Sequence, residues 1–560
     1  MNGGNTNEKL VCLLLAVLLV LGACACAAKD QTTASDTTDQ PAAQEPADTA
    51  DNADETATAD VDPLGKYDTP VEITTTMNED NIRNVESSQT MDSNVWHDLF
   101  AEYGINVSYK FSGSASDLET KINMAIATDD LPDVMSVTAT QFADLTDTDM
   151  LADLTDVFET YASDKLKAKL YADGGVMMSN GYVDGKLYAI VLPIAYYDYI
   201  PVVSIRSDWL EECGLEAPKT MDDLWNIAKT FKDNNMGGTC TIGIGMTKNV
   251  TDVLTAGVGL LNGYHAYSNI WLEKDGELVN SNIQPEMKAA LGALAEKYSE
   301  GLIDPEFGTK ENAQIVEDVM AGRCGIVVSN FCAPFDLANA AADGQQWSFY
   351  AVPSVDGEPV LAQESANFTG GVVVSAKCEH PEAVIKLFNL FAEYEFDEKT
   401  GNNAAGLRNF AYPFVVDDIN ANYKIHNEYL QFLETGKTPE TVTAGYDSTV
   451  EACEKYNKDG NMEGWSMYAI FGPDSTEALV NAAVEANGYL VSAYTGSSTE
   501  SMLNYDSTLK TLTEQFITDV IRGVKTVDDF DDYVASWKAN ADYHGGDKIT
   551  EEVNAWYTAQ

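Results

Sequence analysis

The sequence predicts an α/β protein with more than one lobe, and three observations support this prediction. The chain has 560 residues, and chains of this length usually fold around more than one hydrophobic core. Strand-like and helix-like patterns alternate between residues 70 and 137, which is typical of an α/β lobe. Residues 184–215 place two apolar, strand-like runs around the aromatic segment 196–199. Such a segment can take the chain from one lobe into the next, although a buried strand pair with core tyrosines has the same local pattern.

The first lobe is expected to begin near Tyr67. Its predicted elements are a strand at 70–76, a helix at 94–103, a strand at 105–111, a helix at 117–127 started by Ser116, and a strand at 134–137. Strands that alternate with helices predict a largely parallel sheet. Ligands bind at the loops that follow the carboxyl ends of such strands, and here these loops contain Asn78, Thr138 and Gln141.

The chain continues with mixed elements and then becomes mostly helical. Further strands are predicted at 187–192, 200–205, 241–246, 326–328, 349–353 and 371–375, and further helices at 221–233, 284–300, 313–320 and 381–392. Ser207 is expected to cap a helix that follows the second central strand. From residue 392 to Gln560 the pattern is mostly helical. The sequence has no fixed-period repeat, so a solenoid is not expected.

Residues 1–23 are typical of an export signal. Lys9 precedes an apolar run at 10–21, which is shorter than the ~20 residues that a membrane span needs. The run ends in Leu-Gly-Ala-Cys, which resembles the bacterial lipobox, so Cys24 is predicted to be lipidated. Cys26 also follows small residues, and an ordinary cleaved signal is the alternative. A diacylated cysteine carries the two chains that stable membrane anchoring requires.

Residues 24–67 are predicted to form a disordered tether. They are rich in Ala, Thr, Asp, Gln and Pro and contain no aromatic residue before Tyr67. Such a segment cannot bury enough apolar surface to offset its chain entropy. A flexible chain of roughly 40 residues has a typical span of about 35 Å, which would hold a globular body away from a membrane.

Composition and motifs argue against several classes of function. The formal charge is −56, and such a surface repels nucleic acid, so no nucleic-acid partner is expected. The nine cysteines form no C-x-x-C pair, the five histidines form no H-E-x-x-H motif, and there is no G-x-x-x-x-G-K-[ST] loop. We therefore expect no metal, no cofactor and no enzymatic activity. A glycosidase needs only two placed carboxylates, however, and in a chain with 89 acidic residues the absence of a motif does not exclude one.

Aromatic residues beside polar ones on predicted loops indicate a carbohydrate ligand. The aromatic residues are Tyr196, Tyr197, Tyr199, Phe331, Trp347, Phe368 and Trp465, and their polar neighbours include Asp198 and Asn330. A pyranose ring offers an apolar C–H face for stacking and hydroxyl groups for directed hydrogen bonds. Core packing is the alternative role for each aromatic residue. Tyr196, Tyr197 and Trp465 have the most loop-like flanks.

Several short motifs occur in an order that resembles the family 1 extracellular solute-binding proteins of bacterial ABC importers. They are Ala127-Thr-Asp-Asp-Leu-Pro-Asp133, Gly185-Lys-Leu-Tyr-Ala-Ile190, residues 205–215 leading to Pro218-Lys-Thr220, Tyr298-Ser-Glu-Gly-Leu-Ile-Asp304, Ala321-Gly-Arg-Cys-Gly325, and Asp528-Asp-Phe-Asp-Asp-Tyr-Val534. The resemblance covers residues 68–560 and is greatest for the large lipoprotein subgroup associated with uptake of complex oligosaccharides. It implies an α/β, periplasmic-binding-protein-like fold of type II, in which hinge strands join two lobes.

The resemblance also implies lobe boundaries and ligand contacts. Residues 68–195 and 367–400 would form the N-lobe, residues 196–366 the first part of the C-lobe, and residues 401–560 a mostly helical region that completes the C-lobe and the hinge. By analogy with sugar-binding members, the ligand contacts are Asn78, Thr138, Gln141, Tyr196, Tyr197, Asp198, Asn330, Phe331, Phe368 and Trp465. Many members carry a calcium loop after the helix that here ends near Lys232. Residues 233–238 lack its regular spacing of oxygen ligands, so no calcium site is expected.

The predicted function is that of a monomeric substrate-binding lipoprotein at the extracellular face of the cell membrane. It would capture a carbohydrate, an oligosaccharide in this interpretation, and deliver it to the permease subunits of an ABC transporter. The alternatives are a secreted glycoside hydrolase with two cleft carboxylates and a sugar-sensing or adhesive lipoprotein without an importer. The sequence names neither the sugar nor its length.

Overall fold

A computed structural model describes residues 61–82, 85, 88–193, 197–252, 256–366, 368–400, 404–443, 445–539 and 545–559. The predicted export signal, Cys24 and the tether up to residue 60 lie outside the described residues. Tyr196 also lies outside them, and of Asp198 only the backbone is described. Among the helices in these ranges, none combines the length and the hydrophobicity that crossing a bilayer requires.

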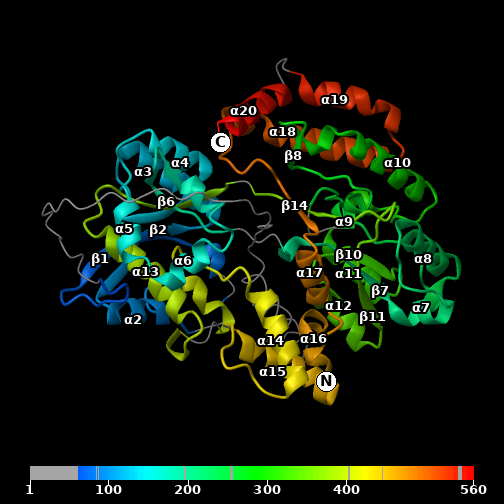
Figure 1. The fold of residues 1–560 in the computed structure, drawn as a ribbon, viewed down its shortest axis with the longest axis horizontal. Coiled ribbons are helices and arrows are strands. Elements are labelled where there is room, and N and C mark those ends of the chain that lie inside the picture. Colours follow the sequence, from blue (N-terminus) through cyan, green and yellow to red (C-terminus); the bar gives the residue numbers. More distant parts are fainter. Residues whose placement is uncertain are drawn as a thin grey trace, which may run out of the picture.

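The first of two α/β lobes is built on two small sheets (Figure 1). β1 (Val71–Asn78) pairs in parallel with β2 (Ile105–Gly113). β13 (Gly370–Val374) lies between β3 (Val134–Thr138) and β6 (Ala189–Ile190) and runs antiparallel to both. The prediction of a largely parallel sheet is therefore wrong for the second sheet. Its middle strand returns from a distant part of the chain, so the local alternation of strands and helices does not determine its direction.

The apolar run predicted as a single strand at 187–192 is divided between two partners. β5 (Lys186–Leu187) forms a hairpin with β4 (Tyr182–Val183). Between them Asp184 and Gly185 have φ values of 51° and 78°, as a type I′ turn requires. The following strand, β6, then leaves the hairpin and pairs with β13. The predicted strand is therefore two strands of two residues each.

Helices surround these sheets and close the first core. They are α2 (Val95–Glu102), α3 (Ala115–Thr128), α4 (Ala139–Thr146), α5 (Thr155–Tyr161), α6 (Asp164–Leu170) and α13 (Pro381–Tyr394). The rings of Trp96 and Phe391 stack with centroids 5.0 Å apart between α2 and α13. The predicted start of α3 at Ser116 is wrong by two residues, because the Ser114 hydroxyl accepts the Asp117 N–H at 3.2 Å and caps the helix.

The second lobe is centred on β7 (Val202–Arg206), which is buried along its whole length. It pairs antiparallel with β10 (Ile326–Ser329) and β11 (Trp347–Ala351). The surrounding helices are α7 (Ser207–Cys213), α8 (Met221–Asp233), α9 (Ala256–Gly263), α10 (Pro285–Ser299), α11 (Asn312–Met320) and α12 (Ala333–Ala342). Residues 241–246, predicted as a strand, make only isolated bridges to Ile303, Cys324 and Val327.

The helix after β7 begins one residue earlier than predicted. Ser207 is its first residue and provides no side-chain cap. The preceding Arg206 donates from Nε to Asp208 at 2.8 Å and lies 4.2 Å over the Trp209 ring. The carboxylate of Asp208 is therefore held in the first turn by an arginine, and Ser207 is not the N-cap.

The last helices of the chain complete the second lobe. They are α18 (Glu500–Ile521), α19 (Phe530–Lys538) and α20 (Gly546–Thr558), and they pack beside α10 and the hairpin of β8 (Trp271–Lys274) and β9 (Glu277–Asn280). The amide of Asn554 on α20 accepts the Leu278 N–H at 2.8 Å and donates to the Leu278 carbonyl at 2.9 Å. This pair of bonds attaches α20 to β9.

A third group of helices lies partly between the two lobes, at one edge of the view, and partly against the second lobe (Figure 1). It consists of α14 (Ala421–Thr435), α15 (Tyr446–Asp459), α16 (Trp465–Phe471) and α17 (Thr476–Glu485). After it, β14 (Tyr489–Val491) pairs in parallel with β12 (Ala362–Glu364). The prediction of a helical C-terminal region is confirmed.

Buried side chains divide among separate cores, which locates the connections between the lobes. The first core contains residues from 71–191 and 368–416, and the second contains residues from 203–352 and 494–553. Tyr197, Ile200 and Ala366 belong to a third core together with α14–α17. Within the described residues the chain therefore leaves the first core near 191–200, 366–368 and 416–419. Residues 407–416, which the sequence assigned to the second lobe, pack in the first core.

Candidate ligand-binding site

The first lobe contains a cavity of about 510 Å³ where β1 and β3 end and where α3 and α4 begin. Its walls include Asn78, Thr138 and Gln141, three of the predicted ligand contacts. The other side is formed by β13, Val191 and Leu192. The strand ends and helix starts thus gather these polar side chains, as expected for loops at the carboxyl edge of α/β strands.

The polar atoms of two of these residues are already engaged with the protein. Thr138 and Gln141 form a capping box at the start of α4, with N–H to side-chain distances of 3.2 and 3.0 Å. The Gln141 amide also donates to Asn123 at 2.9 Å and is 3% exposed. Gln141 therefore fixes the cavity wall. A direct contact from Gln141, Thr138 or Asn78 to a ligand stays a prediction.

The backbone at Gly370 brings β13 close to β3 at this cavity. Its φ is 141°, a value that side-chain-bearing residues rarely adopt. A Cβ at this position would overlap the Val137 carbonyl oxygen. A glycine is therefore required where the two strands meet at the cavity floor.

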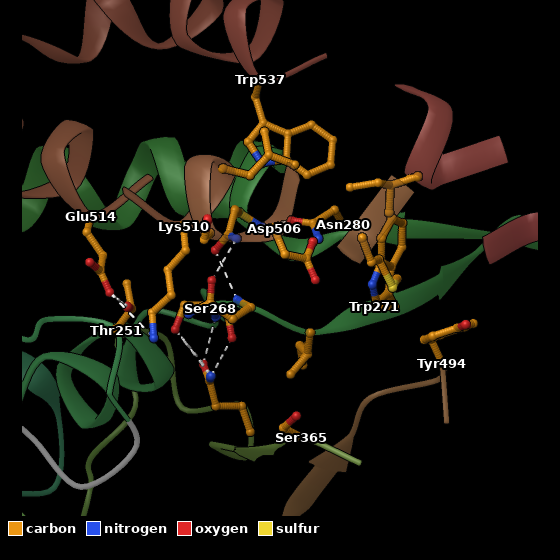
Figure 2. Close-up of a pocket in the computed structure, with 18 of the residues that line it drawn as sticks. Thr251, Ser268, Trp271, Asn280, Ser365, Tyr494, Asp506, Lys510, Glu514 and Trp537 are labelled. Atoms are coloured by element: carbon orange, nitrogen blue, oxygen red, sulfur yellow. Dashed lines mark hydrogen bonds and ion pairs between the residues drawn. The ribbon is translucent and has the colours of Figure 1, made fainter. Parts of the chain in front are cut away.

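A second, larger cavity of about 790 Å³ lies in the second lobe. It is enclosed by the β8–β9 hairpin, the segment 363–365, the loop after β14, and α18–α20 (Figure 2). Its lining includes the aromatic residues Trp271, Tyr494 and Trp537, the amides Asn249, Asn269, Asn280, Asn282 and Gln363, and the hydroxyls Thr251, Ser268, Ser365, Ser498 and Ser507. In Figure 2, Trp271 and Tyr494 lie at one end and Thr251, Lys510 and Glu514 at the other.

The polar wall of this cavity is held by hydrogen bonds within the protein. Oε1 of Gln363 accepts the Ser268 N–H at 2.7 Å, and its Nε2 donates to the Ser268 carbonyl at 2.6 Å. Asn262 donates to the same Oε1 at 3.3 Å. Beside them, Asn269 and Asn282 bond each other twice at 3.0 Å. These groups are positioned before any ligand arrives, which lowers the entropic cost of binding.

Three carboxylates and one lysine line the second cavity. Nζ of Lys510 is 3.9 Å from Glu514, which also accepts a hydrogen bond from Thr251 at 3.3 Å. Asp506 is exposed to the cavity, yet the surrounding walls limit its hydration and raise its pKa to about 6. Its charge therefore changes in a pH range that many ligand-binding measurements cover.

The linings of the two cavities come close to each other in the sequence at one stretch of chain. Gln363 and Ser365 line the second cavity, and residues 369–372 line the first. Phe368, between them, forms a parallel bridge to Ser497, whose neighbours Gly496 and Ser498 also line the second cavity.

The other predicted contacts lie in packed environments. Tyr197 packs edge-on against Tyr489 at 5.5 Å, and Phe368 against Phe142 at 5.6 Å. Phe331 is 1% exposed and Trp465 9% exposed. Asn330 is also buried and accepts the Cys332 N–H at 3.2 Å. Protein atoms cover these side chains, and their role at a ligand stays a prediction, as do those of Tyr196 and the Asp198 side chain, which the structure does not describe.

The sequence analysis did not include the residues of the second cavity. Trp271, Tyr494 and Asp506 come from three separate stretches that meet only in the folded lobe. A local signal was present in the polar segment Ser492-Ala-Tyr-Thr-Gly-Ser-Ser-Thr499. Its small hydroxyl residues around a tyrosine are typical of a binding loop.

The fold, two α/β lobes between which the chain passes more than once, is that of a type II solute-binding protein, as predicted. The family model described as "Bacterial extracellular solute-binding protein" matches residues 84–396. The chain belongs to this family, and the resemblance noted in the sequence is confirmed.

The chain is also similar to named proteins. The polygalacturonan/rhamnogalacturonan-binding protein YtcQ of Bacillus subtilis is 23% identical over 233 residues, which is 40% of this chain and 44% of YtcQ, so this match spans less than half of that relative. The lipoprotein LipO of Bacillus subtilis is 22% identical over 410 residues, 68% of this chain and 73% of LipO. Among solved structures, an HMO binding ABC-transporter associated solute-binding protein from Bifidobacterium longum infantis has a TM-score of 0.58 at 16% identity, covering 88% of this chain and 99% of that chain. At these identities the likeness supports the fold alone.

Proposed function

We propose that this chain is the substrate-binding lipoprotein of an ABC importer and that it captures an oligosaccharide between its two lobes. The observation that supports this most is that each lobe has a cavity and that residues close together in the sequence line both of them: Gln363 and Ser365 line the second cavity, and residues 369–372 line the first. Amide and hydroxyl side chains match the hydroxyl groups of a sugar, and the apolar walls match its C–H faces. The names of YtcQ and of the Bifidobacterium longum infantis protein agree with a sugar ligand.

The proposed mechanism is closure of the lobes on the ligand. The chain leaves the first core near 191–200, 366–368 and 416–419, and rotation at these connections would bring the two cavities together. Ligand that contacts both lobes favours the closed state by its higher affinity for that state. The closed form would dock on the permease, while a lipid on Cys24 and the tether keep the body at the extracellular face of the membrane.

Calorimetry combined with small-angle scattering tests this proposal. The protein is titrated with each member of a broad panel of oligosaccharides. A member that binds should release or absorb heat at one site per chain, and the radius of gyration should fall as the lobes close. Absence of heat with a broad panel of oligosaccharides would contradict the proposal. Heat without a change in radius would contradict closure.

A secreted glycoside hydrolase is the second candidate, because such an enzyme needs two placed carboxylates and the described lining of the second cavity includes Asp252, Asp506 and Glu514. Incubation with an oligosaccharide that gives heat in the titration, followed by chromatography, distinguishes the two functions. A binding protein returns the sugar unchanged, and a hydrolase shortens it. The third interpretation, a sugar sensor or adhesin, predicts binding without a permease encoded beside this protein.

A further inference from the structure

We propose that the ligand of the two cavities is an uncharged oligosaccharide and that the lining rejects sugars that carry carboxylates. This inference rests on the proposed function, because it specifies the class of ligand for the same site.

The charged groups of the second cavity are mostly acidic. Asp252, Asp506 and Glu514 line it together with one cation, Lys510. Lys510 lies one helical turn from Glu514, and the 3.9 Å between their charged groups offsets part of the lysine charge. A ligand carboxylate would therefore approach Asp506 without a further cation among the described lining residues to balance it.

The described lining of the first cavity has no basic side chain that could balance the charge of a ligand carboxylate. Its described lining contains one acid, Glu119, and neither Lys nor Arg. Helix N-termini attract anions, but both of those at this cavity already have partners. The Ala115 N–H of α3 donates to Asp80 at 3.0 Å, and the start of α4 is closed by its capping box.

Among the residues that the structure describes, Lys510 is the only basic side chain that lines either cavity. The formal charge of −56 adds a long-range repulsion that slows the approach of a polyanion. Local and long-range electrostatics therefore act in the same direction.

The same lining favours neutral sugars. Amide side chains both donate and accept hydrogen bonds, and a carboxylate accepts strong, charge-assisted bonds from hydroxyl groups. Asp506 and Asn280 place a carboxylate and an amide side by side in one cavity, and both can accept hydrogen bonds from sugar hydroxyl groups (Figure 2). In this respect the chain is expected to differ from its relative YtcQ, whose name specifies polygalacturonan, a polymer of uronic acids.

A competition experiment with the full-length chain tests the inference. The immobilised protein is incubated with an equimolar mixture of malto-, xylo-, galacto- and fructo-oligosaccharides and galacturonate and alginate oligosaccharides of matched length. Mass spectrometry then identifies the retained sugars. A retained pool of neutral sugars is the expected result. A pool dominated by uronates overturns this inference and leaves the proposed function intact, whereas retention of no sugar overturns the proposed function and this inference with it.

Charge-removing variants test the physical cause. Asp506→Asn combined with Glu514→Gln removes two lining carboxylates and frees Lys510, so the uronate fraction of the retained pool should rise severalfold. Glu211→Gln removes one charge from the exposed face of α7 and should retain the wild-type pool. The single variant Asp506→Asn provides the same test if the double variant folds poorly, as judged by circular dichroism. An unchanged uronate fraction in the folded variants overturns the inference.

Discussion

The substitution Gln363→Leu tests whether the buried amide network holds the second cavity together. Leucine is close to glutamine in size but can neither accept the Ser268 N–H nor donate to the Ser268 carbonyl, which are now bonded at 2.7 and 2.6 Å. Ser268 is fully buried, so both backbone groups would lose their partners without access to water. Each buried, unsatisfied polar group costs about 1–3 kcal/mol. The expected loss in the free energy of unfolding is therefore about 2–6 kcal/mol.

Differential scanning calorimetry measures this loss. About 2–4 °C per kcal/mol is typical for domains of a few hundred residues, so the second-lobe transition should move down by roughly 5 °C or more. Gln515→Leu is the matched control, because Gln515 is exposed on α18 and should change stability by no more than about 0.5 kcal/mol. If Gln363→Leu lowers the transition no further than this control, the network does not contribute as argued. The affinity for sugar should also fall in the variant, because the cavity wall would lose its fixed position.

Three further substitutions have definite expected results. The pKa of Asp506 is raised to about 6, so this side chain binds its proton more tightly in the folded protein than in the unfolded one. Its ionised form therefore opposes folding above pH 6. Asp506→Asn should raise Tm at pH 8 but leave it unchanged at pH 4. An equal shift at both pH values would contradict this origin. Gly370→Ala should cost about 1–3 kcal/mol in urea unfolding, whereas Gly292→Ala inside α10 should be neutral or stabilising; equal effects would refute the strain argument. Lys169→Met would leave the buried Glu395 carboxylate without its cation, a loss of about 3–5 kcal/mol at pH 7, and adding Glu395→Leu should restore most of the stability measured by the same unfolding curves. Failure of the double variant to recover would show that the pair matters for its geometry rather than its charge.

Local patterns predicted most of the individual elements. The helix α8 has the predicted bounds, because Thr220 and Asp223 form a capping box at its start and its apolar residues share one face. Asn78 and Thr138, the last residues of β1 and β3, could be placed at the edge of the first cavity because a strand end is visible in the sequence. What the local patterns could not show is the direction of β13, since it depends on where the chain re-enters the first lobe.

The candidate site was predicted only in part, for a related reason. One wall of the first cavity is formed by the ends of β1 and β3 and the starts of α3 and α4, which lie close together in the sequence, so a prediction from strand ends could locate it. The second cavity joins the β8–β9 hairpin to α18–α20 across more than two hundred residues, and no local pattern links them. Aromatic composition was a poor guide, because Phe331 and Phe368 pack in cores, while Trp271 lines the cavity.

The attachment of α20 to β9 through Asn554 and Leu278 has a consequence for the order of events after synthesis. The first core is complete once residue 416 is available, but the roof of the second cavity includes Trp537 and Ile549. A chain that is synthesised from its N-terminus would therefore have a complete first core but an incomplete second cavity until its final helices are available. Removal of those helices by a protease would take Trp537 and Ile549 from the second cavity and would also remove the side chains of α18–α20 from the second core.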